Sequence, residues 1–168
     1  MPGLLCHRED EAVGERRLAA LLELIHRGGL IYRDLKSTNV LVTEAGALRL
    51  VDFELTSAGS ADAALHDVLG RGTTGYMSPQ QAAGDAPTVA DDVYSLGATL
   101  YCMVTGVVPF NNSNPLDCWM KKIRNEFPTP KELNKAVSER VDWAIRRAMS
   151  AEPGQRPNSC REFLEDLT

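Results

Sequence analysis

Apolar residues recur at helical spacing along much of the chain. In residues 11–26 they fall three or four positions apart, which predicts one amphipathic helix ended by Gly28–Gly29. Residues 92–104 are strongly apolar, so a central, buried helix is predicted there. Further amphipathic helices are predicted near 115–125, 137–149 and 158–167.

Three short apolar runs, 30–32, 40–42 and 48–51, follow the first helix. The last two are separated by a four-residue turn and predict a small β-hairpin. Residues 54–75 are rich in Gly, Ser, Thr and Ala with little periodicity, which predicts a long loop of the kind that is usually functional. We therefore expect one mainly helical α+β domain over residues 1–168, with 1–11 as a loose N-terminal segment.

Composition narrows the class of protein. A hydrophobic fraction of 43% and a charged fraction of 24% are ordinary for a globular domain. The net charge of -5 disfavours nucleic-acid binding, which needs clustered Lys and Arg. The longest charge-free run, 93–116, contains Pro109 and Pro115 in its second half and predicts a buried helix and a loop rather than a membrane span. We expect a cytoplasmic protein.

The four cysteines are widely spaced, with no C-x-x-C pair and no His at metal-ligand spacing, so neither a zinc motif nor a disulfide framework is predicted. Reduced thiols fit a cytosol-like compartment. His26 is predicted to be exposed, and Lys121–Lys122 to lie on a solvated helix face.

The segment Tyr32–Asn39, YRDLKSTN, carries the candidate chemistry. It places a carboxylate (Asp34), an ammonium (Lys36) and an amide (Asn39) close together. Asp52 follows directly after the apolar run 48–51. Phosphoryl transfer requires a positioned hydroxyl, positive charge on the transferring oxygens and bound metal. The segment resembles the protein-kinase catalytic loop, H-R-D-L-x-x-x-N, with Tyr32 in place of the usual His.

The resemblance implies roles for these residues. Asp34 would accept the proton of the attacking hydroxyl, and Lys36 would neutralise the γ-phosphate of ATP. Asn39 and Asp52 would hold Mg²⁺ against the phosphates. D-L-K-x-x-N is similar to serine/threonine rather than tyrosine kinases, and Arg33 completes the loop motif.

Later segments also resemble the family. Residues 72–80, GTTGYMSPQ, are similar to its substrate-positioning loop and A-P-E motif, and Thr73 is expected to hydrogen-bond Asp34 and Lys36. Asp92 is expected to brace the backbone of the catalytic loop. Arg156 matches the late Arg that pairs with the A-P-E glutamate, where this chain has Gln80.

The chain also departs from the family pattern elsewhere. Protein kinases have a Lys on a strand of the N-lobe that binds the phosphates of ATP. Lys36 is the first lysine of this chain, so no residue can play that part. We therefore expect a C-lobe alone, its N-lobe missing, unless Met1 is an internal start. Glu54 replaces the Gly of D-F-G, where it would stiffen the segment or add a carboxylate near the metal. Gln80 cannot form an ion pair, so a looser substrate loop is expected unless another carboxylate compensates.

We therefore expect the C-lobe of a bacterial-type serine/threonine protein kinase that uses ATP and Mg²⁺ and transfers phosphate poorly by itself. Its partners would be a protein substrate or the missing N-lobe. A kinase-derived module that binds partners without turnover is the alternative, and a fragment of a lanthipeptide-synthetase-like kinase domain is a minor one.

Overall fold

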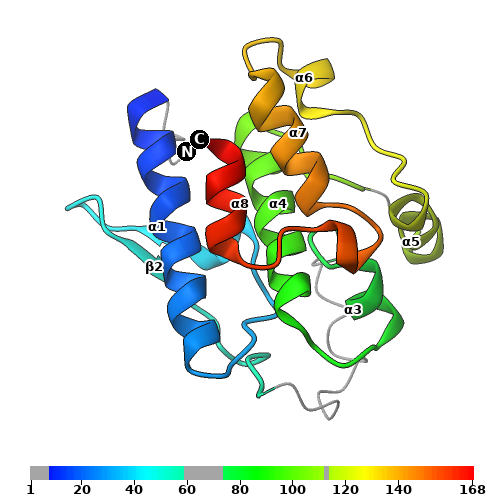
Figure 1. Ribbon diagram of the computed structural model, residues 1–168, viewed down its shortest axis with the longest axis horizontal. Coiled ribbons are helices and arrows are strands. Elements are labelled where there is room, and N and C mark those ends of the chain that lie inside the picture. The colour runs from blue at the N-terminus through cyan, green and yellow to red at the C-terminus, as the bar shows by residue number, and fades with distance from the viewer. Residues whose placement is uncertain (1–7, 59–73, 112–113) are drawn as a thin grey trace.

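The computed structural model describes residues 8–58, 74–111 and 114–168. Most of the described elements are helices, with one small antiparallel sheet near the first helix (Figure 1). In chain order they are α1 (Arg8–Arg27), η1 (Ser37–Asn39), β1 (Val40–Val42), β2 (Leu48–Leu50), α3 (Pro79–Ala83), α4 (Val89–Thr105), α5 (Pro115–Ile123), α6 (Pro130–Leu133), α7 (Glu139–Ala148), η2 (Pro153–Gln155) and α8 (Cys160–Leu167).

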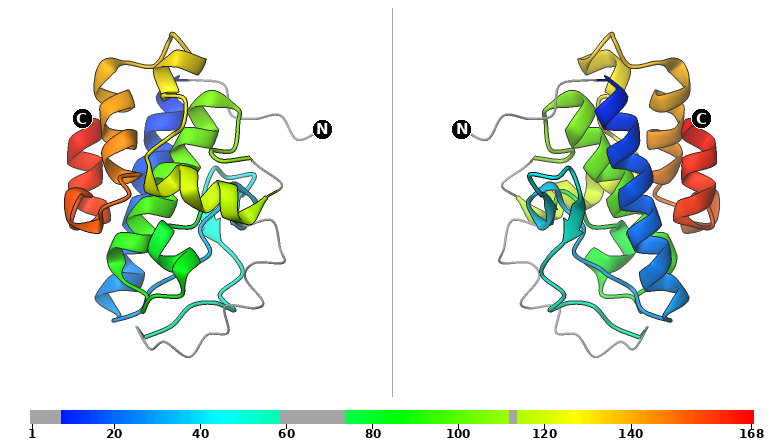
Figure 2. Two further views of the ribbon diagram at one scale, coloured as in Figure 1. Left: turned by 90° about the vertical axis from the view of Figure 1, so that its right-hand side faces the viewer. Right: turned by 90° about the vertical axis from the view of Figure 1, so that its left-hand side faces the viewer.

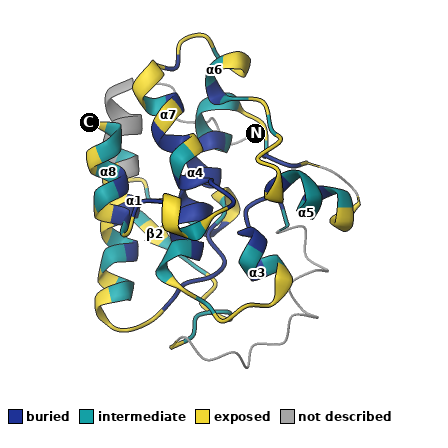
Figure 3. Cartoon of the chain, turned by 45° about the vertical axis from the view of Figure 1, so that its right-hand side comes forward, coloured by how far each residue is buried: buried dark blue, intermediate teal, exposed yellow. Residues whose placement is uncertain are grey.

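Helix α4 forms the centre of the molecule. Its residues 91–101 are all buried, and α1, α7 and α8 pack around it (Figures 1 and 3). Gly97 allows the close approach of α7, because a Cβ at this position would lie 2.8 Å from the Cβ of Ala148. The core therefore depends on a residue without a side chain at this crossing.

Both ends of α4 are defined by local hydrogen bonds. The Asp91 carboxylate accepts the Thr88 N–H at 2.8 Å, which satisfies a backbone donor at the start of the helix. At the other end Gly106 adopts a left-handed conformation with φ 73°, and its N–H donates to the Cys102 carbonyl at 2.8 Å. These bonds place Asp91 and its neighbour Asp92 in the first turn.

The sheet is a two-stranded hairpin beside α1 (Figure 2). Val40 is opposite Leu50 and Val42 is opposite Leu48, so the register brings the start of β1 next to the end of β2. The Val51 N–H then donates to the Asn39 carbonyl at 3.1 Å. This arrangement carries the residues before β1 and after β2 to the same end of the hairpin.

The fold class predicted from sequence is confirmed, since the structure is mainly helical with one small hairpin. The helix expected over 11–26 starts earlier, at Arg8, and α3 and α6 were not predicted. The apolar run 30–32 forms only an isolated bridge, between Ile31 and Ser57. Most of the expected loop 54–75 lies outside the described residues. Across the described residues, no helix is long and apolar enough to cross a membrane.

Candidate functional site

Asp34 lies at the centre of a small polar cluster. Its side chain is buried, and its Oδ2 accepts hydrogen bonds from Lys36 Nζ at 2.8 Å and from Asn39 Nδ2 at 2.9 Å. Asn39 Nδ2 also donates to the Asp34 carbonyl at 2.9 Å. Asp34 Oδ1 is buried and has no hydrogen-bond partner among the described residues. One oxygen is thus held in place while the other remains an unfilled acceptor, which for a buried polar atom calls for an explanation.

A buried carboxylate on α4 holds the backbone of the predicted catalytic loop, residues 32–39. Asp92 is fully buried, and it accepts the Arg33 N–H on Oδ1 and the Tyr32 N–H on Oδ2, both at 2.8 Å. His26 Nε2 lies 2.7 Å from the same Oδ2. The prediction that His26 is exposed was wrong, because the last turn of α1 faces α4 and leaves this side chain 8% exposed.

Two of the predicted site residues have left-handed backbones. Arg33 has φ 71°, a strained conformation for a residue other than Gly, Asn or Asp, whereas Asp52 has φ 65°, which Asp tolerates more easily. Asp92 supports the first through its bond to the Arg33 N–H. The Gln81 side chain supports it too, because its Nε2 donates to the Arg33 carbonyl at 2.7 Å. Such strain persists only where surrounding contacts fix it, and it is common at active sites.

Tyr32, which replaces the usual His, connects the catalytic loop to the segment of Asp52. Its ring is fully buried and packs edge-to-face on Phe53 with centroids 5.2 Å apart, and its hydroxyl donates to the Val51 carbonyl. Burial raises the pKa of the phenol, and the carboxylates of Asp34 and Asp52 raise it further. Tyr32 therefore stays a neutral donor beside these acids.

Glu54 occupies an exposed turn after Asp52 and Phe53. Among the described residues other than glycine, positive φ occurs at Arg33, Asp52, Phe110 and Asn125, and not at Glu54. A Cβ at this position therefore causes no backbone strain in this conformation, which explains how Glu replaces Gly here.

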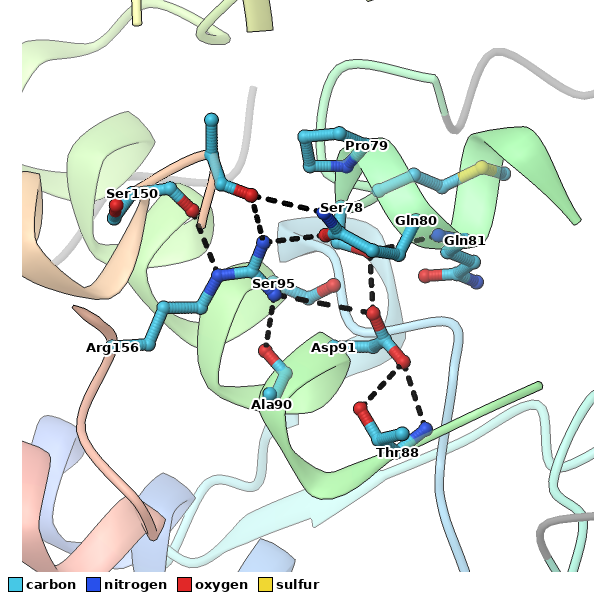
Figure 4. Close-up of polar contacts among 12 residues, drawn as sticks. Ser78, Pro79, Gln80, Gln81, Thr88, Ala90, Asp91, Ser95, Ser150 and Arg156 are labelled. Carbon is cyan, nitrogen blue, oxygen red and sulfur yellow. Dashed lines mark hydrogen bonds and ion pairs between the residues drawn. The ribbon is translucent and has the colours of Figure 1, made fainter. Parts of the chain in front are cut away.

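Arg156 and Gln80 are joined by a hydrogen bond, as Figure 4 shows. Arg156 is 1% exposed, and its Nη2 donates to Gln80 Oε1 at 2.6 Å. The guanidinium also donates to the carbonyls of Ser150, Ala90 and Ala151 at 2.8, 3.0 and 3.1 Å.

A carboxylate near this guanidinium comes from α4 instead of the A-P-E position. Asp91 Oδ1 lies 4.0 Å from Arg156 Nη1 and accepts the hydroxyl of Ser78, while Oδ2 accepts the N–H and hydroxyl of Thr88 (Figure 4). Burial lowers the pKa of Arg156 and the Asp91 carboxylate acts in the opposite direction, so we expect Asp91 to compensate for the missing A-P-E glutamate. The position of Asp91 one residue before Asp92 was the available signal.

The substrate-loop segment that the structure describes, residues 74–78, is tied to the core. The hydroxyls of Tyr76 and Ser37 share a hydrogen bond at 3.1 Å, and the Tyr76 carbonyl accepts the Ser95 hydroxyl at 3.0 Å. Burial raises the pKa of Tyr76 to about 12. Thr73, expected to bond Asp34 and Lys36, lies outside the described residues.

Lys122 is a further anchor of this segment, and its predicted solvation was wrong. It is 1% exposed, and its Nζ donates to the carbonyls of Thr74 and Met77. The ammonium also lies 5.5 Å from the ring centre of Tyr94 and 5.3 Å from that of Phe110. Lys122 lies four residues after a buried cysteine on the same helix, a helical spacing that could have indicated burial.

Comparisons with known proteins agree with this geometry. The profile of the protein kinase domain matches residues 12–167. The chain is 36% identical over 151 residues to a probable serine/threonine-protein kinase of Clostridium perfringens, covering 90% of this chain and 22% of the relative. It is 30% identical over 148 residues to serine/threonine-protein kinase PknB of Mycobacterium tuberculosis, covering 87% of this chain and 24% of the relative. It is 29% identical over 142 residues to PrkC of Bacillus subtilis, covering 84% and 22%.

A helical lobe with an Asp-Lys-Asn cluster in the segment before a small hairpin is the arrangement of a protein-kinase C-lobe. The chain belongs to the protein kinase family and is of the bacterial serine/threonine type. It spans 22–24% of the length of these curated relatives.

Proposed function

We propose that this chain supplies the catalytic-loop lobe of an ATP-dependent serine/threonine protein kinase. The observation that carries the proposal is the Asp34 carboxylate, held through Oδ2 by Lys36 and Asn39 while the buried Oδ1 lacks a donor among the described residues. A general base must be able to accept a proton from a substrate hydroxyl. Among the described residues nothing donates to Asp34 Oδ1, so it has the acceptor capacity that this role requires.

Asn39 and Asp52 suit Mg²⁺, the family's metal, because amide and carboxylate oxygens are its preferred protein ligands. Asn39 uses its Nδ2 group to bond Asp34, which leaves its amide oxygen for a metal. When bound, Mg²⁺ would neutralise charge on the phosphates of ATP. The chain's own part is to hold the hydroxyl of the substrate at Asp34 and to place the Lys36 ammonium beside it.

The surface next to these residues supports the expectation that a second lobe covers it. Leu41 and Val42 in the hairpin and Phe53 beside Asp52 are 50%, 47% and 51% exposed, so apolar side chains are left uncovered near the site. An N-lobe that completes the ATP site is the partner that the family relation favours.

The catalytically silent module remains the second candidate, favoured by the substitutions at positions 54 and 80. Both are accommodated here, since Glu54 avoids positive φ and Gln80 still bonds Arg156. No described contact favours the lanthipeptide-synthetase alternative over the first two candidates.

The test is to compare the 168-residue chain with a fusion that carries the N-lobe of PrkC at its N-terminus. We expect ATP- and Mg²⁺-dependent phosphorylation of a Ser/Thr protein substrate by the fusion and very little by the unfused chain. Asp34→Asn should lower the fusion's kcat by roughly 10²-fold or more, because the base is lost. Asp85→Asn, an exposed Asp in the turn after α3, is the matched control and should leave kcat unchanged.

Two results would count against the proposal. A folded fusion that neither binds ATP nor phosphorylates any substrate supports the silent module. Robust phosphorylation by the unfused chain, abolished by Asp34→Asn, refutes the dependence on a second lobe.

A further inference from the structure

A thiol, an imidazole and a carboxylate meet where the end of α1 packs against the start of α8. Glu23 and His26 lie three residues apart on α1, so they share one face of the helix. Cys160 is the first residue of α8. One potential ligand atom from each side chain lies within 4.8 Å of the other two. Cysteine and histidine spacing alone does not predict this cluster, because its members come from opposite ends of the chain.

His26 provides the observation that points to a ligand. Its Nε2 lies 2.7 Å from the carboxylate of Asp92, which accepts the Nε2 proton and leaves the other ring nitrogen, Nδ1, as the remaining acceptor. The side chain is 8% exposed, and Nδ1 has no hydrogen-bond partner among the described residues. A buried polar atom without a partner is energetically costly. The pair also has the arrangement that orients metal-binding histidines, in which the second ring nitrogen bonds a carboxylate.

Cys160 and Glu23 add a sulfur and an oxygen donor. Cys160 is fully buried, and burial together with the nearby carboxylates of Asp92 and Glu23 raises the pKa of its thiol. Glu23 Oε1 accepts the Arg161 N–H at 2.9 Å, so the carboxylate is fixed at the N-terminal end of α8. A divalent cation would displace the thiol proton to solvent and offset the charges of the thiolate and the carboxylate.

We propose that Glu23, His26 and Cys160 form a three-ligand site for Zn²⁺, with water as the fourth ligand. Mixed sulfur, nitrogen and oxygen donors suit this borderline-soft ion, whereas Mg²⁺ and Ca²⁺ prefer oxygen alone. The site shares no ligand with the Asp34 cluster, although His26 contacts Asp92, which holds the loop of Asp34, and metal binding here does not require phosphoryl transfer. The competing explanation is a purely structural contact, in which Glu23 caps α8 and Cys160 fills the core.

Titration of the chelator-treated 168-residue chain with Zn²⁺, and with Co²⁺ as a spectroscopic probe, tests the site. We expect one high-affinity equivalent, a rise in Tm on binding, and a thiolate-to-cobalt charge-transfer band in the near ultraviolet. Cys160→Ser should abolish the band and weaken Zn²⁺ binding by about tenfold or more. Cys102→Ser is the matched control, since Cys102 lies on α4, outside the cluster, and should leave both unchanged.

Glu23→Gln is a second variant, because substitution of His26 would also remove a partner of Asp92. The amide oxygen can still accept the Arg161 N–H, so the fold should be retained while Zn²⁺ binding weakens by about tenfold. The proposal is overturned if the chain binds no stoichiometric Zn²⁺, or if Cys160→Ser and Glu23→Gln bind it as tightly as the unsubstituted chain. The last result would place the metal outside this cluster.

Discussion

Replacement of Lys122 by Met tests how the substrate loop is held. The ammonium of Lys122 is buried against two aromatic rings and donates to the carbonyls of Thr74 and Met77. Burial lowers its pKa to about 8 from the usual 10.5, although the neighbouring Cys118 acts in the opposite direction. Lys122→Met removes both the charge and the two hydrogen bonds.

Lys122→Met has two opposing effects on folding stability: it removes a costly buried charge, and it removes the donor of two carbonyls. A pKa lowered from 10.5 to about 8 means that keeping the buried ammonium protonated costs about 3 kcal/mol of folding stability. The buried Met77 carbonyl left without this donor costs roughly 1–3 kcal/mol, and the partly buried Thr74 carbonyl, which also accepts the Cys118 thiol, costs less. We therefore expect Lys122→Met to change the free energy of unfolding at pH 7 by less than about 3 kcal/mol, with destabilisation the favoured sign.

The pH dependence separates the two effects. Below pH 8 the lysine is protonated in both the folded and the unfolded chain, so stability does not change with pH through this group. Between pH 8 and 10.5 the unfolded chain binds more protons than the folded one, so stability rises with pH. Relative to Lys122→Met, the unsubstituted chain should gain about 2–3 kcal/mol between pH 7 and pH 10.

Urea unfolding followed by tryptophan fluorescence at several pH values measures this difference. Lys121→Met is the matched control, because Lys121 is the preceding residue of α5 and forms a surface pair with Asp117 at 3.1 Å. Its stability curve should run parallel to that of the unsubstituted chain. If the curve of stability against pH for Lys122→Met is also parallel to that of the unsubstituted chain, the ammonium of Lys122 is not buried in the folded protein. In an active fusion, Lys122→Met should also lower kcat/KM for a protein substrate, because residues 74–77 lose their anchor.

Three further substitutions test the core and the Arg156 network. Gly97→Ala should lower the free energy of unfolding by about 1–3 kcal/mol, measured in urea, since the new Cβ would lie 2.8 Å from that of Ala148. Asp91→Asn should cost about 3 kcal/mol in the same assay, because it leaves the buried Arg156 guanidinium without its nearby carboxylate. Gln80→Glu should change the free energy of unfolding by less than about 1 kcal/mol, because Asp91 already supplies a negative charge and a second carboxylate would have to be desolvated. A large stabilisation would show that Asp91 does not compensate.

The sequence predicted the elements whose signal is local. The period of apolar residues located α1, α4, α5, α7 and α8, and the turn residues located the hairpin. The order of Asp34, Lys36 and Asn39 in one short segment was enough to place them together, because a loop of that length cannot separate them far. Their roles in catalysis, and that of Asp52, stay predictions.

Features that depend on tertiary packing were missed. The sequence shows Lys122 as one of two adjacent lysines, and only the packing of α5 against residues 74–77 shows which is buried. Asp91 has a local role in the first turn of α4, so its proximity to Arg156 could not be inferred from the helix pattern. His26 was misjudged because its partner, Asp92, is 66 residues away in sequence.

The bonds to Asp92 also set an order of assembly. The catalytic loop takes its native backbone through bonds that join Tyr32 and Arg33 to a residue about 60 positions further along the chain. During synthesis the loop leaves the ribosome well before Asp92 does, and contacts of such long sequence separation form late. Ribosome-bound nascent chains that end before residue 92 will therefore contain the whole catalytic motif without its native geometry, and the site matures only after α4 has docked.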